Sequence, residues 1–145
     1  MRIGLAFLEA DRQNLTRAKL VEAAQAVEGA GFDGMWFFDA MGRGDILPDP
    51  LIGATLAASV TERIEVGTCI LQVPLRRPVE VAHRILTTHL FCEGRFSLGV
   101  GAGSTKGDFD FVGLDFSQRM AMLEEALPIM QKVWRDEEVN GHRLS

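Results

Sequence analysis

The stretch Met35-Trp36-Phe37-Phe38-Asp39 sets the interpretation of this 145-residue sequence. Four consecutive apolar residues without alternation are typical of a strand that is buried on both faces, as strands of a parallel sheet are. A polar, glycine-containing loop follows the strand, from residue 39 to 49. Because neighbouring parallel strands are joined by long crossover connections, we expect a helix on each side of this strand.

The same alternation of short apolar runs and helical patterns continues along the chain. Three more strands are predicted, at residues 3–8, 64–71 and 96–100. Helices are predicted behind the N-cap candidate Asn14, from residue 50 to about 60 behind the N-cap Asp49, from 78 to about 90, and from the N-cap Ser117 to Trp134. Residues 101–113 are predicted to form a loop.

The last predicted helix carries an apolar stripe, and Pro128 inside it predicts a kink. The stripe consists of Met120, Leu123, Leu127, Met130 and Trp134. With this helix the order of elements is βαβαβαβα, which predicts parallel strands with right-handed crossovers. Two architectures fit that order, a doubly wound sheet or a barrel, and a barrel needs eight strands in about 250 residues.

Composition argues against several classes of function. The chain has a formal net charge of -5 and 47% hydrophobic residues, and its basic pair Arg76-Arg77 is too short to track a nucleic acid. No apolar run reaches the roughly 18 residues of a membrane span, and no signal peptide is recognised. Cys69 and Cys92 lack metal-site spacing and are interpreted as free, buried thiols, so we expect a cytoplasmic protein.

The glycines of Gly99-Val100-Gly101-Ala102-Gly103 leave two interpretations open. A dinucleotide-binding turn would place a helix start inside the glycines, directly after a first strand. Here a long segment separates them from the next predicted helix, which favours a tight turn where the backbone approaches another group closely.

Other candidate groups are few. Asp39 ends the second predicted strand, at the edge where parallel barrels keep their sites, and is interpreted either as a site residue or as a cap of the following loop. His83, His89 and His142 have no carboxylate or cysteine at ligand spacing and are expected to be non-catalytic. The sequence contains neither a metal-binding cluster nor a Ser-His-Asp arrangement.

Several motifs together resemble the bacterial luciferase-like monooxygenase superfamily. Their order and spacing extend over nearly the whole chain. The motifs are Ala30-Gly31-Phe32-Asp33-Gly34-Met35-Trp36, Asp49-Pro50, Thr61-Glu62-Arg63-Ile64-Glu65-Val66-Gly67-Thr68, Pro74-Leu75-Arg76-Arg77-Pro78, and Gly94-Arg95-Phe96-Ser97-Leu98 followed by the glycines of residues 99–103. Asp108-Phe109 and Phe111-Val112-Gly113 follow in the family's order.

The resemblance implies a barrel that binds flavin mononucleotide (FMN), or a deazaflavin in one branch, at the carboxyl end of its strands. It also implies a non-proline cis peptide between Cys69 and Ile70, in a bulge of the third strand that supports the cofactor ring. The residues expected to bind the cofactor are Asp39, Thr68, Cys69, Ile70, Gln72, Ala102 and Gly103.

Two positions depart from the family's pattern. Deazaflavin dehydrogenases of the family often place a histidine after the Asp of the second strand, and a glutamate after the glycines of the fourth. Ala40 and Ser104 occupy these positions here, and alanine cannot transfer a proton. The resemblance therefore favours a flavin-dependent monooxygenase that uses reduced FMN and oxygen on a small organic substrate. A deazaflavin-dependent oxidoreductase and a non-catalytic, oligomerising flavin-binding protein are the alternatives.

We therefore expect residues 1–145 to be the N-terminal part of a (β/α)₈ barrel. With four strands they would form a parallel (β/α)₄ half of a TIM-type barrel, which is incomplete as given. We expect open sheet edges, an uncovered inward face with Ile3, Leu5 and Phe7, and a homo-oligomer. The expected partners are a small-molecule substrate and a flavin reductase, and Arg43 and Asp45 are expected in a loop facing the pocket.

Overall fold

The computed structural model describes residues 1–9, 11–41, 44 and 46–145. Strands and helices alternate along the chain, as predicted. They are β1 (Gly4–Phe7), α1 (Arg17–Gly29), β2 (Gly34–Phe37), α2 (Pro50–Ala58), β3 (Glu65–Gln72), α3 (Pro78–Phe91), β4 (Phe96–Gly101), α4 (Lys106–Val112) and α5 (Arg119–Trp134). Short 3-10 turns, η1 (Val73–Leu75) and η2 (Phe116–Gln118), follow β3 and precede α5.

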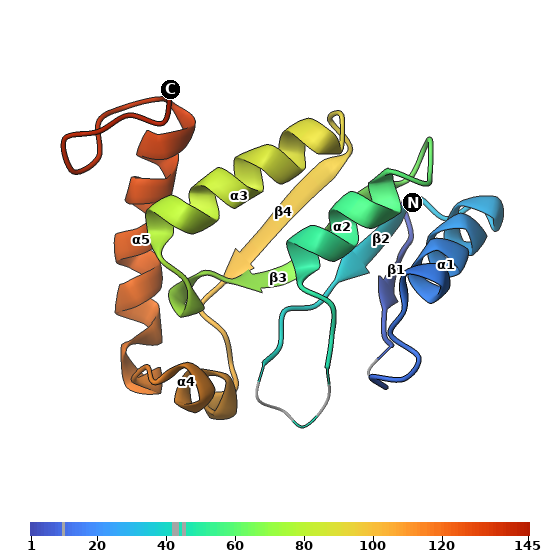
Figure 1. Ribbon diagram of the computed structural model, residues 1–145, viewed down its shortest axis with the longest axis horizontal. Coiled ribbons are helices and arrows are strands. Elements are labelled where there is room, and N and C mark those ends of the chain that lie inside the picture. Colours follow the sequence, from blue (N-terminus) through green and yellow to red (C-terminus); the bar gives the residue numbers. More distant parts are fainter. Residues whose placement is uncertain (10, 42–43, 45) are drawn as a thin grey trace.

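All four strands are parallel and pair in chain order, β1-β2-β3-β4. Helices α1, α2 and α3 lie on the same face of this sheet (Figure 1). A doubly wound sheet would instead reverse its strand order at a switch point and carry helices on both faces. The arrangement is therefore that of half a TIM-type barrel.

Two apolar clusters fill the space between the sheet and its helices. The first joins α1, α2 and β2 and includes Leu20, Ala24, Met35, Phe37, Ala54 and Ala57. The second joins β3, α3 and α5 and includes Leu71, Val81, Ala82, Ile85 and Met130. Among the described residues no helix is long and apolar enough to cross a membrane.

The direction of the β1 side chains differs from the expectation. Leu5 and Phe7 pair with Met35 and Phe37, which point into the helix-side cluster, and Phe7 packs against that cluster too. The opposite face, which would be inside a barrel, carries Trp36. The error came from assuming that the larger side chains of the first strand face inward. Leu5 is nevertheless 40% exposed, because β1 is an open edge.

Two helix starts and one predicted loop also differ from the predictions. Thr16, rather than Asn14, caps α1 by accepting the N–H of Lys19 at 3.3 Å, while Asn14 donates its side-chain amide to Asp11 in the preceding turn. Ser117 lies inside η2, so it does not cap α5. The segment predicted as a loop contains α4.

The apolar stripe predicted for α5 is correct except at Met120, since Leu123 and Trp134 pack partly buried against the second cluster. Met130 is buried, but Met120 is 53% exposed. The buried positions Ala126 and Val133 complete the face that packs on α3. The helix continues through Pro128.

Glu28 joins the end of α1 to the start of β3. Its carboxylate accepts the backbone N–H groups of Glu62, Arg63 and Ile64 at 2.6–3.1 Å. Burial raises the pKa of Glu28, but these three hydrogen bonds, with the charge of Arg63, outweigh that effect and hold the pKa below its ordinary value of 4.5. The contact fixes the register of the loop that leads into β3.

Candidate functional site

A cavity of about 370 Å³ opens at the carboxyl edge of the sheet, where β2 and β3 end and the segment after β4 begins. This is the edge at which parallel α/β folds place their ligands. The lining residues are Leu8, Phe38, Asp39, Ala40, Leu47, Cys69, Ile70, Gln72, Gly103 and Ser104. The cavity thus brings together five of the seven residues predicted to bind a cofactor, which come from three separate strands and their loops.

Asp39 is held by a buried ion pair with Arg76. The two side chains are 3% and 10% exposed. Arg76 Nη1 donates to Oδ2 at 2.5 Å and Nη2 donates to Oδ1 at 2.9 Å, which is the bidentate geometry that a planar guanidinium favours. Oδ2 also accepts the backbone N–H of Gln72 at 2.7 Å. With three donors on its two oxygens, Asp39 serves as a fixed anionic wall of the cavity.

Gln72 fastens three segments together. Its Nε2 donates to the backbone carbonyl of Asp39 at 2.7 Å and to the buried carboxylate of Asp108 on α4 at 2.8 Å. Both amide protons are therefore engaged, which fixes which end of the amide is the oxygen. That oxygen, Oε1, is buried without a hydrogen-bond partner. The amide of Gln72 thus donates only to groups of the protein, although Gln72 also lines the cavity.

Gly103 is required by the position of Gln72. It has a φ of +83°, a region that L side chains rarely adopt, and a Cβ at this position would lie 2.2 Å from Gln72 Oε1. Gly101 has the same relation to the bulge, since a Cβ there would lie 2.8 Å from Ile70 Cδ1. These contacts support the close-approach interpretation of the glycines over the dinucleotide-binding one, and the next helix starts only at Lys106.

The bulge of β3 is present where the resemblance implied it. The peptide bond between Cys69 and Ile70 is cis, and the pairing with β4 shifts between Thr68 and Leu71. The hydroxyl of Thr68 donates to the carbonyl of Gly99 at 2.7 Å and accepts its N–H at 3.0 Å, which holds β4 beside the bulge. Thr68 and Ala102 do not line the cavity, whereas Cys69 and Ile70 do. The expectation of two buried thiols is wrong for Cys69, which is exposed at the bulge, and correct for Cys92.

The two positions that depart from the family's pattern both face the cavity. Ala40 follows Asp39 in its wall and Ser104 follows Gly103. Neither side chain can exchange a proton near neutral pH as a histidine or a glutamate would. Neither position therefore supplies the histidine or the glutamate of that pattern. No group of three metal-ligating side chains occurs in the part of the chain that the structure describes.

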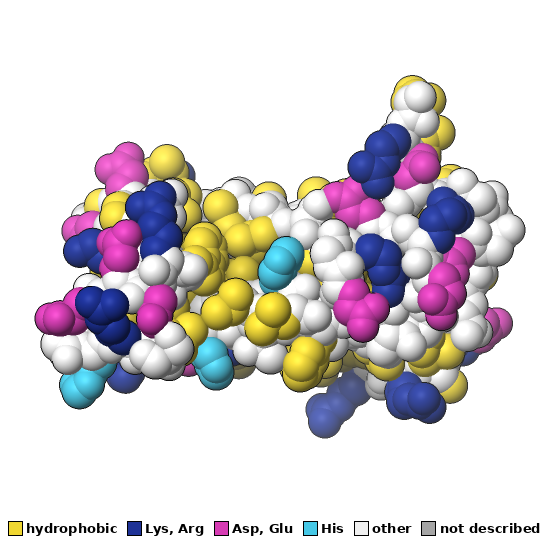
Figure 2. Space-filling view, turned by 90° about the horizontal axis from the view of Figure 1, so that it is seen from above, with side chains coloured by type: hydrophobic (Ala, Val, Ile, Leu, Met, Phe, Trp, Pro, Cys, Tyr) yellow, Lys and Arg dark blue, Asp and Glu magenta, His cyan; other side chains and the backbone are white. Residues whose placement is uncertain are grey.

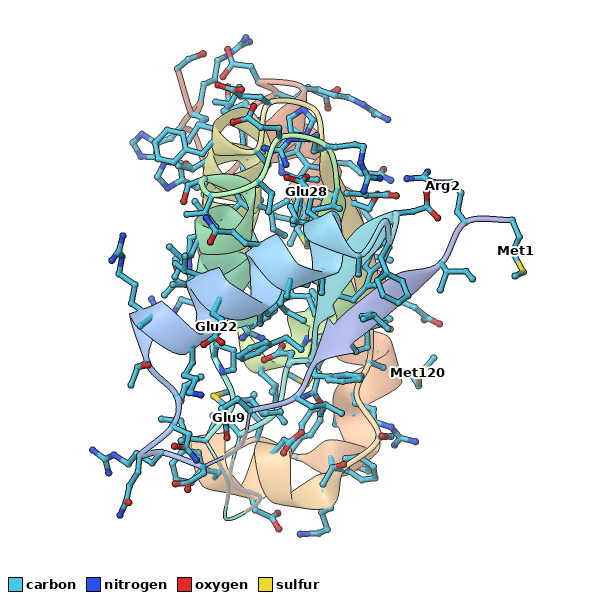
Figure 3. All side chains as sticks on the ribbon, turned by 90° about the vertical axis from the view of Figure 1, so that its right-hand side faces the viewer. Met1, Arg2, Glu9, Glu22, Glu28 and Met120 are labelled. Atoms are coloured by element: carbon cyan, nitrogen blue, oxygen red, sulfur yellow. The ribbon has the colours of Figure 1, made fainter. Side chains whose placement is uncertain are left out.

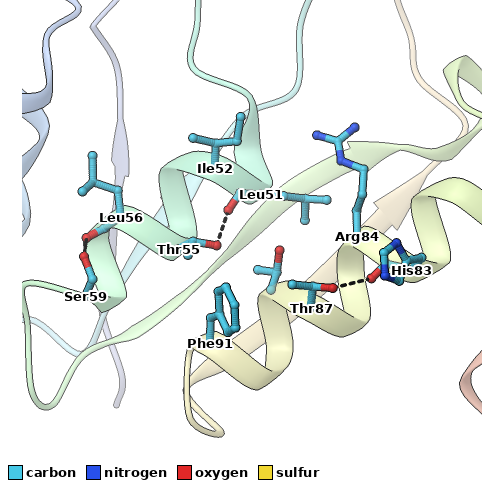
Figure 4. A pocket seen from close by; sticks show the side chains of 10 residues that line it. Leu51, Ile52, Thr55, Leu56, Ser59, His83, Arg84, Thr87 and Phe91 are labelled. Carbon is cyan, nitrogen blue, oxygen red and sulfur yellow. Dashed lines mark hydrogen bonds between the residues drawn. The ribbon is translucent and has the colours of Figure 1, made fainter. Parts of the chain in front are cut away.

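A larger cavity, of about 620 Å³, lies elsewhere, in a groove between α2 and α3 (Figure 4). Apolar side chains such as Ile52, Leu56 and Phe91 line it, with His83 and Arg84 at one side. The hydroxyls of Thr55, Ser59 and Thr87 are bonded to carbonyls of their own helices, so they offer little to a ligand. We place the functional site in the smaller cavity because buried polar groups converge there.

Sequence analysis missed two residues of this site. Arg76 enters the sequence analysis only as half of the basic pair Arg76-Arg77. Of these two residues, Arg77 is exposed and Arg76 is not. Asp108 was noticed only as part of a motif, and it is fully buried on α4. No local signal indicates the burial of Arg76, because Arg76 and Arg77 stand side by side behind Val73 to Leu75. Arg43 and Asp45, expected to face the pocket, lie outside the described residues.

Comparison with known proteins agrees with this geometry. A model of the luciferase-like monooxygenase family matches residues 1–143. The 4-hydroxyprotoasukamycin monooxygenase of Streptomyces nodosus subsp. asukaensis is 32% identical over 120 residues, which make up 81% of this chain and 32% of that protein. The F420-dependent glucose-6-phosphate dehydrogenase of Amycolatopsis mediterranei is 30% identical over 129 residues, 83% of this chain and 39% of that protein.

The fold agrees as well. The oxygenating constituent of 3,6-diketocamphane monooxygenase of Pseudomonas putida, solved in complex with FMN, superimposes with a TM-score of 0.84 at 24% identity. The alignment covers 99% of this chain and 43% of that one, so the chain spans less than half the length of the relatives it matches. Its four strands correspond to half of a TIM-type barrel. With a family match over nearly all of its residues, the chain belongs to the luciferase-like monooxygenase family.

Proposed function

We propose that residues 1–145 are the N-terminal part of a (β/α)₈ flavin-dependent monooxygenase, and that they form one wall of its FMN site. The observation that carries this proposal is the convergence of Asp39, Cys69, Ile70, Gln72 and Gly103 on one cavity at the carboxyl edge. Its volume of about 370 Å³ suits one planar ring system, since small-molecule sites start near 300 Å³.

The residues of the cavity fit a flavin ring. Cys69 and Ile70 of the β3 bulge line the cavity, and Gly103 lets the backbone after β4 approach Gln72 closely. Reduced FMN would supply the reaction with oxygen that oxidises a small organic substrate. The chain's own residues would orient the ring and exclude water. Asp39 and Ala40 are not expected to transfer protons, because both oxygens of Asp39 are engaged by Arg76 and Ala40 has no proton to give.

Titration of FMN with the purified chain tests the proposal. We expect quenching of flavin fluorescence that saturates in the micromolar range. The substitution Ala40→Phe, which fills the cavity, should weaken binding at least roughly tenfold, or about 1.4 kcal/mol. Ala121→Phe, on the exposed side of α5, is the matched control and should bind like the wild type. No quenching up to high micromolar FMN would contradict autonomous binding.

A deazaflavin is the second candidate cofactor. It is favoured by the similarity to an F420-dependent dehydrogenase. Ala40 and Ser104 argue against the proton transfer of such dehydrogenases, because neither side chain replaces the histidine or glutamate. Parallel titrations with FMN and with a deazaflavin separate the two, and we expect FMN to bind more tightly.

We also propose self-association through the groove between α2 and α3. Ile52 and Phe91 in this groove are 64% and 68% exposed, which is unusual for large apolar side chains on a monomer. Viewed from the end where α3 finishes, apolar side chains gather between two charged regions (Figure 2). Sedimentation velocity should detect a dimer that Ile52→Glu dissociates. We further propose that a flavin reductase supplies the reduced FMN and that the protein is located in the cytoplasm.

A further inference from the structure

The guanidinium of Arg76 lies between two carboxylates that stand at opposite ends of the loop joining β2 to α2. Asp39 at the first end accepts hydrogen bonds from both terminal nitrogens of Arg76. Asp49 at the second end lies 3.8 Å from Nη2. Asp49 also begins α2, because its Oδ1 accepts the N–H groups of Leu51 and Ile52 at 3.0 and 3.2 Å. One side chain from the turn after β3 therefore reaches both ends of this loop.

The loop contributes to the cavity, whereas Arg76 does not. Ala40 and Leu47, one near each end of the loop, line the cavity. Arg76 is absent from the lining, and its Nη1 also donates to the carbonyl of Gln72 at 3.0 Å. Any influence of Arg76 on a ligand in the cavity must therefore pass through the loop and through β3.

The two ends of the loop depend on Arg76 to different degrees. Asp39 is 3% exposed and has Arg76 as its cationic partner in the described structure. Asp49 is 25% exposed and has a second cation, Arg84, at 3.1 Å. A lysine at position 76 would keep the charge, but it could not form the planar, two-point contact with Asp39. Loss of Arg76 should therefore loosen the Asp39 end more than the Asp49 end.

We propose that Arg76 is a positioning residue that fixes the two described ends of this loop, residues 39–41 and 46–49, beside the cavity and thereby sets the affinity of the cavity for its ligand. The identity of that ligand as a flavin rests on the proposed function above. The fixing of the loop does not, so the two can be tested separately.

Hydrogen exchange of the ligand-free chain tests the fixing of the loop. We compare wild type, Arg76→Lys and Arg76→Gln, with Arg77→Gln as the control because Arg77 is the exposed neighbour. Residues 38–41 and the amide of Gln72, which donates to Asp39, should exchange roughly tenfold faster in Arg76→Gln, with a smaller change over 46–52 and none over residues 65–71 of β3 or in β4. Arg76→Lys should fall in between, and Arg77→Gln should match the wild type.

FMN titration of the same variants tests the consequence for the ligand. The dissociation constant should rise roughly tenfold in Arg76→Gln and stay unchanged in Arg77→Gln. If Arg76→Gln fails to fold, the double variant Asp39→Asn/Arg76→Gln leaves no uncompensated buried charge and should show the same loosening at 38–41.

Unchanged exchange over 38–41 in both variants would overturn the proposal, and so would faster exchange spread equally over β3 and β4. Weaker FMN binding without a looser loop would overturn it too. A looser loop in a chain whose wild type does not quench FMN would support the positioning role and count against the proposed function alone.

Discussion

Gln72 donates from Nε2 to the buried carboxylate of Asp108 at 2.8 Å, and this contact joins the end of β3 to α4. The same nitrogen donates to the carbonyl of Asp39 at the end of β2. One amide thus sets the spacing of the two segments that flank the cavity. Both donor protons of this amide are engaged within the protein, and its oxygen is buried without a hydrogen-bond partner, so Gln72 has no donor left for a ligand.

Replacing Gln72 with Glu should destabilise the chain more than replacing it with Leu. Leucine removes a donor from two buried acceptors, which costs about 1–3 kcal/mol. Glutamate also places a third carboxylate beside Asp39 and Asp108, so repulsion between like charges adds to the loss. Urea unfolding at pH 7 measures the difference. Gln118→Glu, at an exposed site before α5, is the control and should stay within about 0.5 kcal/mol of wild type. Equal losses for the two Gln72 variants would contradict the arrangement.

Replacing Gly103 with Ala should cost more than replacing Gly113 with Ala. Both glycines have positive φ, so both variants bear a backbone penalty of about 1–2 kcal/mol. A Cβ at Gly113 meets nothing within 4 Å, whereas one at Gly103 meets Gln72 Oε1 at 2.2 Å. In a Gln72→Ala background this contact disappears and a Cβ at position 103 keeps only the 3.2 Å approach to Phe109 Cε2, so the difference between the two glycine variants should shrink. Thermal unfolding of the four variants checks this, and a difference that is unchanged without Gln72 would assign the cost to another contact.

Glu28→Gln should reduce stability near neutral pH and have little effect in acid. The pKa of Glu28 lies below its unfolded value of about 4.5, so its stabilisation is complete above that pH and is lost as the pH falls through the lower, folded pKa. In Glu28→Gln the three backbone donors lose their ionised acceptor, and we expect this loss to cost roughly 1 kcal/mol at this solvent-accessible site. The labelled side chain lies at the end of α1 (Figure 3). Urea unfolding from pH 7 down through the acid range, with exposed Glu22→Gln as control, measures the difference, and a loss independent of pH would contradict the assignment.

Most strands could be predicted from the sequence because their burial is local information. Residues 35–38, 64–71 and 96–100 were predicted, and β2, β3 and β4 begin and end within one residue of these ranges. The helix α2 was equally clear, since Asp49 and Pro50 are an N-cap and a first-turn proline. The resemblance to the family added the cis peptide after Cys69, which no local pattern indicates.

Features that depend on distant partners could not be predicted in this way. Arg76 and Asp39 are separated by 37 positions, and nothing near Arg76 distinguishes it from exposed Arg77. α4 contains a glycine and two aspartates, which have low helix propensity, so its stability depends on the burial of Phe109 and Asp108. The direction of Leu5 depends on its register with Met35, which only the assembled sheet defines.

Protection of Cys69 by FMN tests most directly whether the cavity at the carboxyl edge holds the flavin ring. Cys69 is exposed and lines the cavity, whereas Cys92 is buried and serves as an internal control. At FMN concentrations about ten times the dissociation constant, alkylation of Cys69 should slow roughly tenfold, because only the free fraction reacts. Cys92 should remain unreactive with or without FMN. Alkylation of Cys69 at the same rate in the presence of FMN that is demonstrably bound would contradict this account.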